Sequence, residues 1–218
     1  MPELARAAVP TAIQVVAVSG RMSHGRPSAL GRISVIPLAS IFHNNPWAAA
    51  QVTAMELHAI EIARPAEDVN VIVGQAHFIK TVEDLYEAIV QAVPGVRFGV
   101  AFSEASGPCL IRHTGTDPAL EAAAVAAAVA IAAGHVFVVM LGNAFPVNVL
   151  NQIKAVSEVC QVFCATANPL RVIVAEQDGA RGVIGVLDGA APRGVEGEAD
   201  RAERHEMQIG RASCRERV

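Results

Sequence analysis

The chain has 218 residues, with 17 Lys and Arg against 21 Asp and Glu, and a formal net charge of −4 at pH 7. Between residues 55 and 196 there are 8 basic and 15 acidic side chains, which argues against the basic face that a nucleic-acid-binding protein needs. The apolar runs before residue 55 are too short and too interrupted to span a bilayer, so we expect neither a nucleic acid nor a membrane as a partner.

The ends of the chain differ from its middle, and we expect the folded domain to cover residues 55–208. Residues 1–54 carry four arginines and one acidic residue, and MELHAIEI from Met55 reads like a new start followed by a strand. We therefore interpret residues 1–54 as an upstream extension from a misassigned start, or as a leader. The last ten residues, IGRASCRERV, match the translation of a sequencing adapter, so residues 209–218 are expected not to be native.

The first half of this domain predicts strands around one helix. The stretch TVEDLYEAIVQAV has apolar residues every three or four positions, which predicts a helix over 81–93, and Thr81 can cap its N-terminus. The loop SEASGP separates two of the apolar runs. Strands are predicted at 56–62, 69–73, 97–102 and 109–113.

The second half alternates helices with strands. An alanine-rich stretch predicts a helix over 118–133, with Asp117 as its N-cap and Gly134 as its C-cap, and a shorter helix is predicted over 147–156. Because strands and helices alternate, we expect an α/β fold, a layered sandwich with a mixed sheet. The strands of this half are predicted at 135–141, 159–166, 170–177 and 182–189, the last two as a hairpin.

Polar loops follow four of the predicted strands. Ligands of open α/β sheets bind in the crevice beyond the carboxyl ends of the strands, so these loops predict a polar pocket. Each loop also has an ordinary explanation as a turn, because Gly, Asn, Ser and Pro favour turns. The four loops read GQAHFIKT, SEASGPC, GNAFPVN and TANP.

A histidine, His77, lies in the first of these loops, just before the helix predicted over 81–93. Its imidazole can act as a nucleophile toward a phosphoryl group, because N–H groups at a helix N-terminus attract anions and Lys80 adds a positive charge. The alternative is a half-buried histidine that only packs. A second histidine, His135, follows a predicted helix end, where a cation stabilises the helix, and this favours a structural role.

Three cysteines remain in the predicted domain: Cys109, Cys160 and Cys164. An odd, sparse count without a signal peptide indicates reduced thiols and a cytoplasmic setting. Cys160 and Cys164 would point to one face of a regular strand, but CxxxC without further Cys or His is weak support for a metal site, so we expect none. A redox or metal protein that uses these thiols is the weakest of three functional interpretations.

Five long motifs resemble the adenosine-specific kinases, a family of small archaeal and bacterial proteins. The resemblance implies a three-layer αβα sandwich that binds adenosine and AMP and carries a stably phosphorylated histidine. It covers the chain from about Met55 to Glu196. In chain order the motifs read NVIVGQAHFIKTVEDLYEA, RFGVAFSEASGPCLIRHTG, AGHVFVVMLGNAFPVNVLNQIK, VCQVFCATANPLRVIVAE and RGVIGVLDGAAPRGVE.

Carried onto this chain, the resemblance implies that His77 is the catalytic, phosphorylated residue, with His135 as the second choice. The candidate ligand-binding residues are polar or glycine residues of the same loops. They are Lys80 beside the phosphate, Glu104, Ser106 and Gly107 for sugar or phosphate, and Asn143, Asn148 and Asn168 for base or ribose.

Two functions are consistent with this resemblance. The first is phosphoryl transfer through His77, as in an adenosine-specific kinase, and the alternative is a non-catalytic AMP sensor that carries a phosphohistidine. The chain lacks a recognisable Walker lysine with a partnered Mg²⁺-binding aspartate, which argues against a standard kinase and leaves enzyme activity open. Adenosine or AMP is the expected ligand, ATP with Mg²⁺ is a candidate phosphoryl donor, and we expect a cytoplasmic homo-oligomer.

Overall fold

A computed structural model of the chain describes residues 55–215, and it describes side chains for residues 55–207. The predicted extension over 1–54 lies outside the described residues, so the proposed domain boundaries stay predictions. Eight strands and four helices follow one another in the described part. They are β1 (Glu56–Ile62), β2 (Asn70–Ala76), α1 (Thr81–Ala92), β3 (Phe98–Ser103), β4 (Ile111–Gly115), α2 (Pro118–Ile131), β5 (Val136–Leu141), α3 (Pro146–Ala155), β6 (Val159–Thr166), β7 (Leu170–Gln177), β8 (Ala180–Asp188) and α4 (Glu198–Arg215).

The strands form two sheets, and the α/β fold class is confirmed. One sheet has the order β4-β3-β5-β2-β6 and the other has the order β1-β7-β8. The predicted mixed sheet is corrected, because every strand pair in both sheets is antiparallel. Each strand–helix–strand crossover joins two parallel strands, but a third strand lies between them, so the parallel strands are never neighbours.

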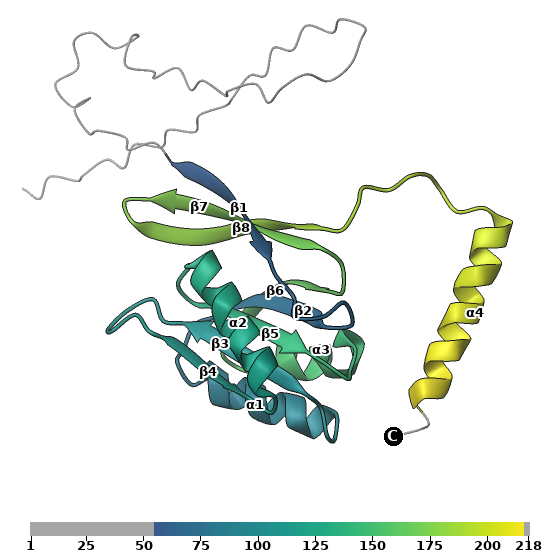
Figure 1. Cartoon of the computed structure of the whole chain (residues 1–218), viewed down its shortest axis with the longest axis horizontal. Coiled ribbons are helices and arrows are strands. Elements are labelled where there is room, and N and C mark those ends of the chain that lie inside the picture. The colour runs from purple at the N-terminus through teal and green to yellow at the C-terminus, as the bar shows by residue number, and fades with distance from the viewer. Residues whose placement is uncertain (1–54, 216–218) are drawn as a thin grey trace, which may run out of the picture. The chain divides into compact units, whose positions relative to one another are not determined.

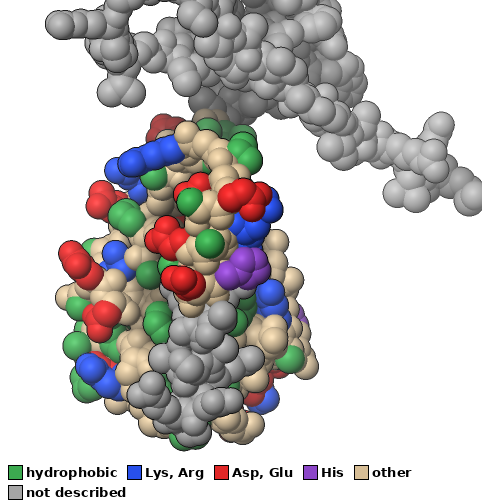
Figure 2. Space-filling model, turned by 90° about the vertical axis from the view of Figure 1, so that its right-hand side faces the viewer, with side chains coloured by type: hydrophobic (Ala, Val, Ile, Leu, Met, Phe, Trp, Pro, Cys, Tyr) green, Lys and Arg blue, Asp and Glu red, His purple; other side chains and the backbone are tan. Residues whose placement is uncertain are grey.

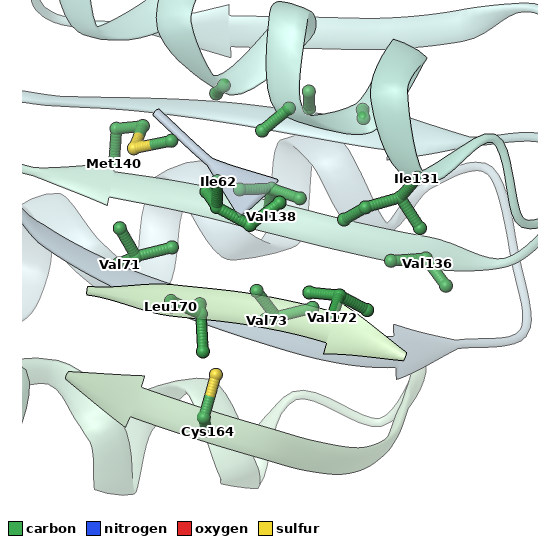
Figure 3. Close-up of a cluster of buried hydrophobic side chains, with 14 of the residues drawn as sticks. Ile62, Val71, Val73, Ile131, Val136, Val138, Met140, Cys164, Leu170 and Val172 are labelled. Atoms are coloured by element: carbon green, nitrogen blue, oxygen red, sulfur yellow. The ribbon is translucent and has the colours of Figure 1, made fainter. Parts of the chain in front are cut away.

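Strands β1 to β8 and helices α1 to α3 form three layers around two hydrophobic cores (Figure 1). Helices α1 and α3 pack on one face of the five-stranded sheet, through residues such as Leu85, Ile89 and Ile153. The opposite face is covered by α2 together with the three-stranded sheet. Figure 3 shows the second core, where Leu170 and other apolar side chains of the two sheets meet those of α2. The expected αβα sandwich is therefore present, with a small sheet sharing one outer layer.

Helix caps explain where two helices begin and end. Asp117 caps α2 as predicted, because its carboxylate accepts hydrogen bonds from the N–H groups of Ala119 and Leu120. The C-cap of α2 is Ala132 in a left-handed conformation, not the predicted Gly134. The predicted cap of α1, Thr81, is the first helical residue instead, because its hydroxyl donates backward to the carbonyl oxygen of Phe78.

Two β-bulges interrupt the pairing of β2 with β6. The register shifts between Val73 and Gly74 and again before Ala76, where Cys160 is the additional residue of β6. A Cβ at Gly74 would lie 2.3 Å from the ring of Phe137, so a glycine is needed at this close approach. The bulges turn Cys160 to solvent while Cys164 is buried, which corrects the expectation that both thiols point to one face.

Candidate functional site

The antiparallel order divides the four post-strand loops between the two ends of the five-stranded sheet. The carboxyl ends of β2 and β3 lie at one end, which we call the His77 edge; the amino ends of β4, β5 and β6 lie there too. The carboxyl ends of β5 and β6 lie at the other, which we call the Asn168 edge. Strand β2 has seven residues, so the two edges are about 20 Å apart. The loops therefore do not line a single pocket within one chain.

His77 is the first residue after β2, and its side chain is exposed. Its backbone N–H donates to the carbonyl oxygen of Glu158 at 3.0 Å, which ties the residue to the start of β6. The next two residues, Phe78 and Ile79, are 52% and 42% exposed, although both are apolar. The imidazole is thus accessible to a ligand, and apolar side chains flank it along the chain.

His135 joins the strands on both sides of it at the His77 edge. Its N–H donates to the carbonyl oxygen of Ser103 at 2.7 Å, and its carbonyl oxygen accepts from Ala76 N–H at 2.9 Å. Its ring stacks on Phe102, with ring centres 6.1 Å apart, and its φ of +64° is rare for a residue with a side chain. Unusual backbone conformations of this kind cluster at functional sites.

Helix α1 begins at Thr81, four residues after His77 in the chain. No side chain caps its first turn, so its N–H groups keep their attraction for an anion. The ammonium of Lys80 lies 2.6 Å from Asp84 in an i,i+4 ion pair. That hydrogen bond raises the pKa of Lys80 above its usual value. Glu83 and Asp84 lie in the same turn, so acidic side chains compete with an incoming phosphate for the helix N-terminus.

The loop between β3 and β4 is held by Glu104. Its carboxylate accepts from the N–H of Leu110 at 2.8 Å and from the guanidinium of Arg112 at 2.8 Å, and its side chain is only 8% exposed. The hydrogen bond from Leu110, and then the one from Arg112, lower the pKa of Glu104 below its usual value. Both carboxylate oxygens therefore have protein partners. Ser106 and Gly107 are exposed at the tip of this loop, where Gly107 has a φ of +67°.

The three predicted asparagines lie at the Asn168 edge, and each has partners within the protein. Asn143 accepts from Arg97 N–H at 2.7 Å and donates to the carbonyl oxygen of Gly95. Asn148 accepts from the N–H of Phe145, which closes the first turn of α3. Asn168 donates to the carboxylate of Asp188 at 3.0 Å. The structure thus gives all three a structural contact and separates them from His77.

A buried hydroxyl at the His77 edge was not identified from the sequence. Ser103 is 7% exposed, and its Oγ has no hydrogen-bond partner among the described residues. Buried polar groups are nearly always paired, so this hydroxyl is an exception to the rule. Only the pairing of β3 with β5 brings Ser103 next to His135, and no local sequence pattern shows that pairing.

The charged side chains and thiols of the described residues give little support to the interpretation as a metal or redox protein. Acidic and basic side chains are interspersed on the face shown in Figure 2. Within the described residues, no group of three or more His, Cys, Asp and Glu side chains is placed to hold a metal ion. Burial raises the pKa of Cys164 to about 11, so this thiol is a poor nucleophile. None of the helices in the described part is long and apolar enough to cross a membrane.

Comparison with known proteins finds one matching family model and a similar solved structure. A family model described as "Adenosine specific kinase" matches residues 60–210. The crystal structure of the PH1918 protein from Pyrococcus horikoshii OT3 is 47% identical in sequence, with a TM-score of 0.69, and the match covers 72% of this chain and 96% of that chain. The comparison with curated proteins gives no match.

Proposed function

Because this chain belongs to the adenosine-specific kinase family, we propose that it binds adenosine or AMP and that His77 accepts a phosphoryl group. Family membership indicates an adenosine-related, kinase-like function. The observation that supports the finer proposal is the position of His77, exposed at the end of a strand and followed by an uncapped helix N-terminus. An exposed imidazole is accessible to a phosphoryl donor, and the helix N–H groups favour the oxygens of the product.

The proposed first step forms an N–P bond. The lone pair of the neutral imidazole of His77 attacks the γ-phosphorus of a nucleoside triphosphate such as ATP, the bond from that phosphorus to the bridging oxygen breaks, and the nucleoside diphosphate leaves while the N–H proton of the ring is released to solvent. In the second step the 5′-hydroxyl of adenosine attacks the same phosphorus, the N–P bond breaks and AMP forms, while the hydroxyl proton passes to the imidazole. Mg²⁺ would accompany the donor, and a homo-oligomer is the assembly that we propose.

The neighbours of His77 suggest how it is held. The hydrogen bond from its N–H to Glu158 fixes its backbone, and His135 fixes the preceding residue, Ala76, from the other side. Two backbone anchors on adjacent residues limit the freedom of the backbone that carries the imidazole, which reduces part of the entropy lost when a phosphoryl donor is aligned with it.

Labelled ATP separates the two candidate functions. We expect purified protein incubated with [γ-³²P]ATP and Mg²⁺ to acquire acid-labile label, and His77→Gln to abolish it while His113→Gln leaves it unchanged. His113, on β4, is a matched control, because it is also exposed but pairs with Glu121 of α2. Label that passes to added adenosine supports the kinase, whereas label that stays on the protein supports the AMP sensor. Label that persists in His77→Gln contradicts both.

A further inference from the structure

A cavity lies far from His77, at the junction of β1, β7 and β8. It has a volume of about 480 Å³, which is within the range of small-molecule sites. Apolar contacts come from Ile62, Pro169 and Leu187, and Leu187 is 53% exposed although it is a leucine. Part of the cavity wall is therefore apolar and exposed to solvent.

Two arginines line this cavity, and neither forms an ion pair within the described residues. Arg64 uses one nitrogen, Nη1, to donate to the carbonyl oxygens of Glu67 and Val69, at 2.9 and 3.1 Å. These bonds fix the guanidinium and leave its Nε and Nη2 donors without a protein acceptor in the described part of the chain. Arg171 has no side-chain hydrogen bond to any described residue. Guanidinium groups with free donors bind phosphate and carboxylate oxygens well.

Two carboxylates complete the lining, those of Glu61 and Glu67, and they also lack ion-pair partners among residues 55–207. With two positive and two negative side chains, the cavity has no net charge. A simple anion would be attracted by the arginines and repelled by the glutamates. A ligand that also carries hydroxyl or amino donors would satisfy both kinds of side chain.

This cavity is distant from His77, the proposed site of phosphoryl transfer. Arg64 is bonded to the carbonyl oxygen of Val69, one residue before β2, whereas His77 follows the other end of β2. The seven residues of β2 between them span about 20 Å, too far for one small ligand to reach both groups. A molecule bound here cannot receive a phosphoryl group from His77 of the same chain.

We propose that this cavity is a second binding site for a small phosphate ester whose organic part has a flat ring and hydroxyl or amino donors, a class that includes nucleoside monophosphates. The phosphate would contact Arg64 and Arg171, the donors would contact the two glutamates, and the ring would pack on Leu187 and Pro169. The use of AMP as the probe rests on the proposed function; the site itself rests on the cavity and its charges.

Calorimetric titration of the full chain with AMP tests this site. We expect Arg171→Gln to weaken binding at one site by about tenfold, because a charge-assisted hydrogen bond is lost. Arg181→Gln is the matched control, since Arg181 lies on β8 of the same sheet but is paired with Glu176 outside the cavity. It should bind AMP as the unchanged protein does. Adenosine and inorganic phosphate should each bind this site more weakly than AMP.

Equal AMP affinity in Arg171→Gln and the unchanged protein would overturn the site, and so would an equal loss in Arg171→Gln and Arg181→Gln. Labelling with [γ-³²P]ATP distinguishes this result from a failure of the proposed function. Arg171→Gln should keep the acid-labile label of His77. If AMP binding depends on Arg171 and no label forms even in the unchanged protein, the proposed second site is supported and the phosphohistidine proposal is contradicted.

Discussion

A phosphoryl group on His77 brings close to two negative charges to a residue that lies three positions before Lys80. The sequence suggested that this lysine compensates those charges. In the structure its ammonium is held by Asp84, and 61% of its side chain is exposed. The uncapped backbone of α1 is therefore the main favourable field for the phosphate, and the ion pair withholds the nearest cation.

Releasing Lys80 should therefore stabilise the phosphorylated state. We expect Asp84→Asn to increase the amount of acid-labile phosphate at steady state by about twofold, a change of the size that an exposed ion pair controls. Glu87→Gln is the control, because it removes the same charge from α1 without breaking the hydrogen bond to Lys80. Equal label in Asp84→Asn and Glu87→Gln would show that Lys80 has no part in holding the phosphate.

The three thiols of the domain should differ sharply in reactivity. Cys109 and Cys160 are exposed, whereas burial raises the pKa of Cys164 to about 11. At pH 8 iodoacetamide should modify the first two within minutes and leave the third unmodified, because the reactive species is the thiolate. Peptide mass spectrometry measures this. Alkylation of Cys164 at the rate of Cys160 would mean that the bulged pairing of β6 is not maintained in solution.

At the scale of the elements, the loop between β3 and β4 is stabilised by a carboxylate that the sequence suggested as a ligand-binding group. Glu104 bridges the backbone of Leu110 and the side chain of Arg112. Replacing Glu104 should thus loosen the hairpin as well as any ligand contact, and a fall in affinity alone would not identify a binding residue.

The stability of this hairpin should depend on pH. Because hydrogen bonds hold the pKa of Glu104 below its usual range, the stabilisation is present above the unfolded-state value of about 4.3 and is lost as the pH falls through the lower folded-state value. We expect Glu104→Gln to lower the Tm by several degrees at pH 7, and the difference from the unchanged protein to shrink below pH about 4. Calorimetric melting at both pH values measures this. A difference in Tm that stays constant with pH would contradict the role assigned to the ionised carboxylate.

The helices could be predicted from local patterns, because each depends on residues within a few turns. Those over 81–93, 118–133 and 147–156 agree with α1, α2 and α3 to within two residues at each end. The caps were harder. Thr81 has the chemistry of an N-cap, but its hydroxyl bonds backward to Phe78, and that choice depends on the turn from β2 into α1.

At the scale of the whole molecule, the position of the loops could not be predicted from the sequence, because it depends on the pairing of strands that are distant along the chain. The interleaved order β4-β3-β5-β2-β6 makes every neighbouring pair antiparallel, and this sends alternate post-strand loops to opposite edges. The expectation of one polar pocket assumed parallel neighbours. Residues such as His77 and Asn168 therefore share a chemical character in the sequence but lie at opposite ends of the sheet.

The central claim is that the phosphoryl group resides on His77, and locating it by mass spectrometry tests this most directly. Protein incubated with ATP and Mg²⁺ should be digested at neutral to mildly alkaline pH and fragmented by a method that keeps the N–P bond. We predict one phosphorylated peptide, with the added mass on the imidazole of His77 and its loss after mild acid. An acid-labile phosphate found on His135 instead, with His77 unmodified, would contradict the claim.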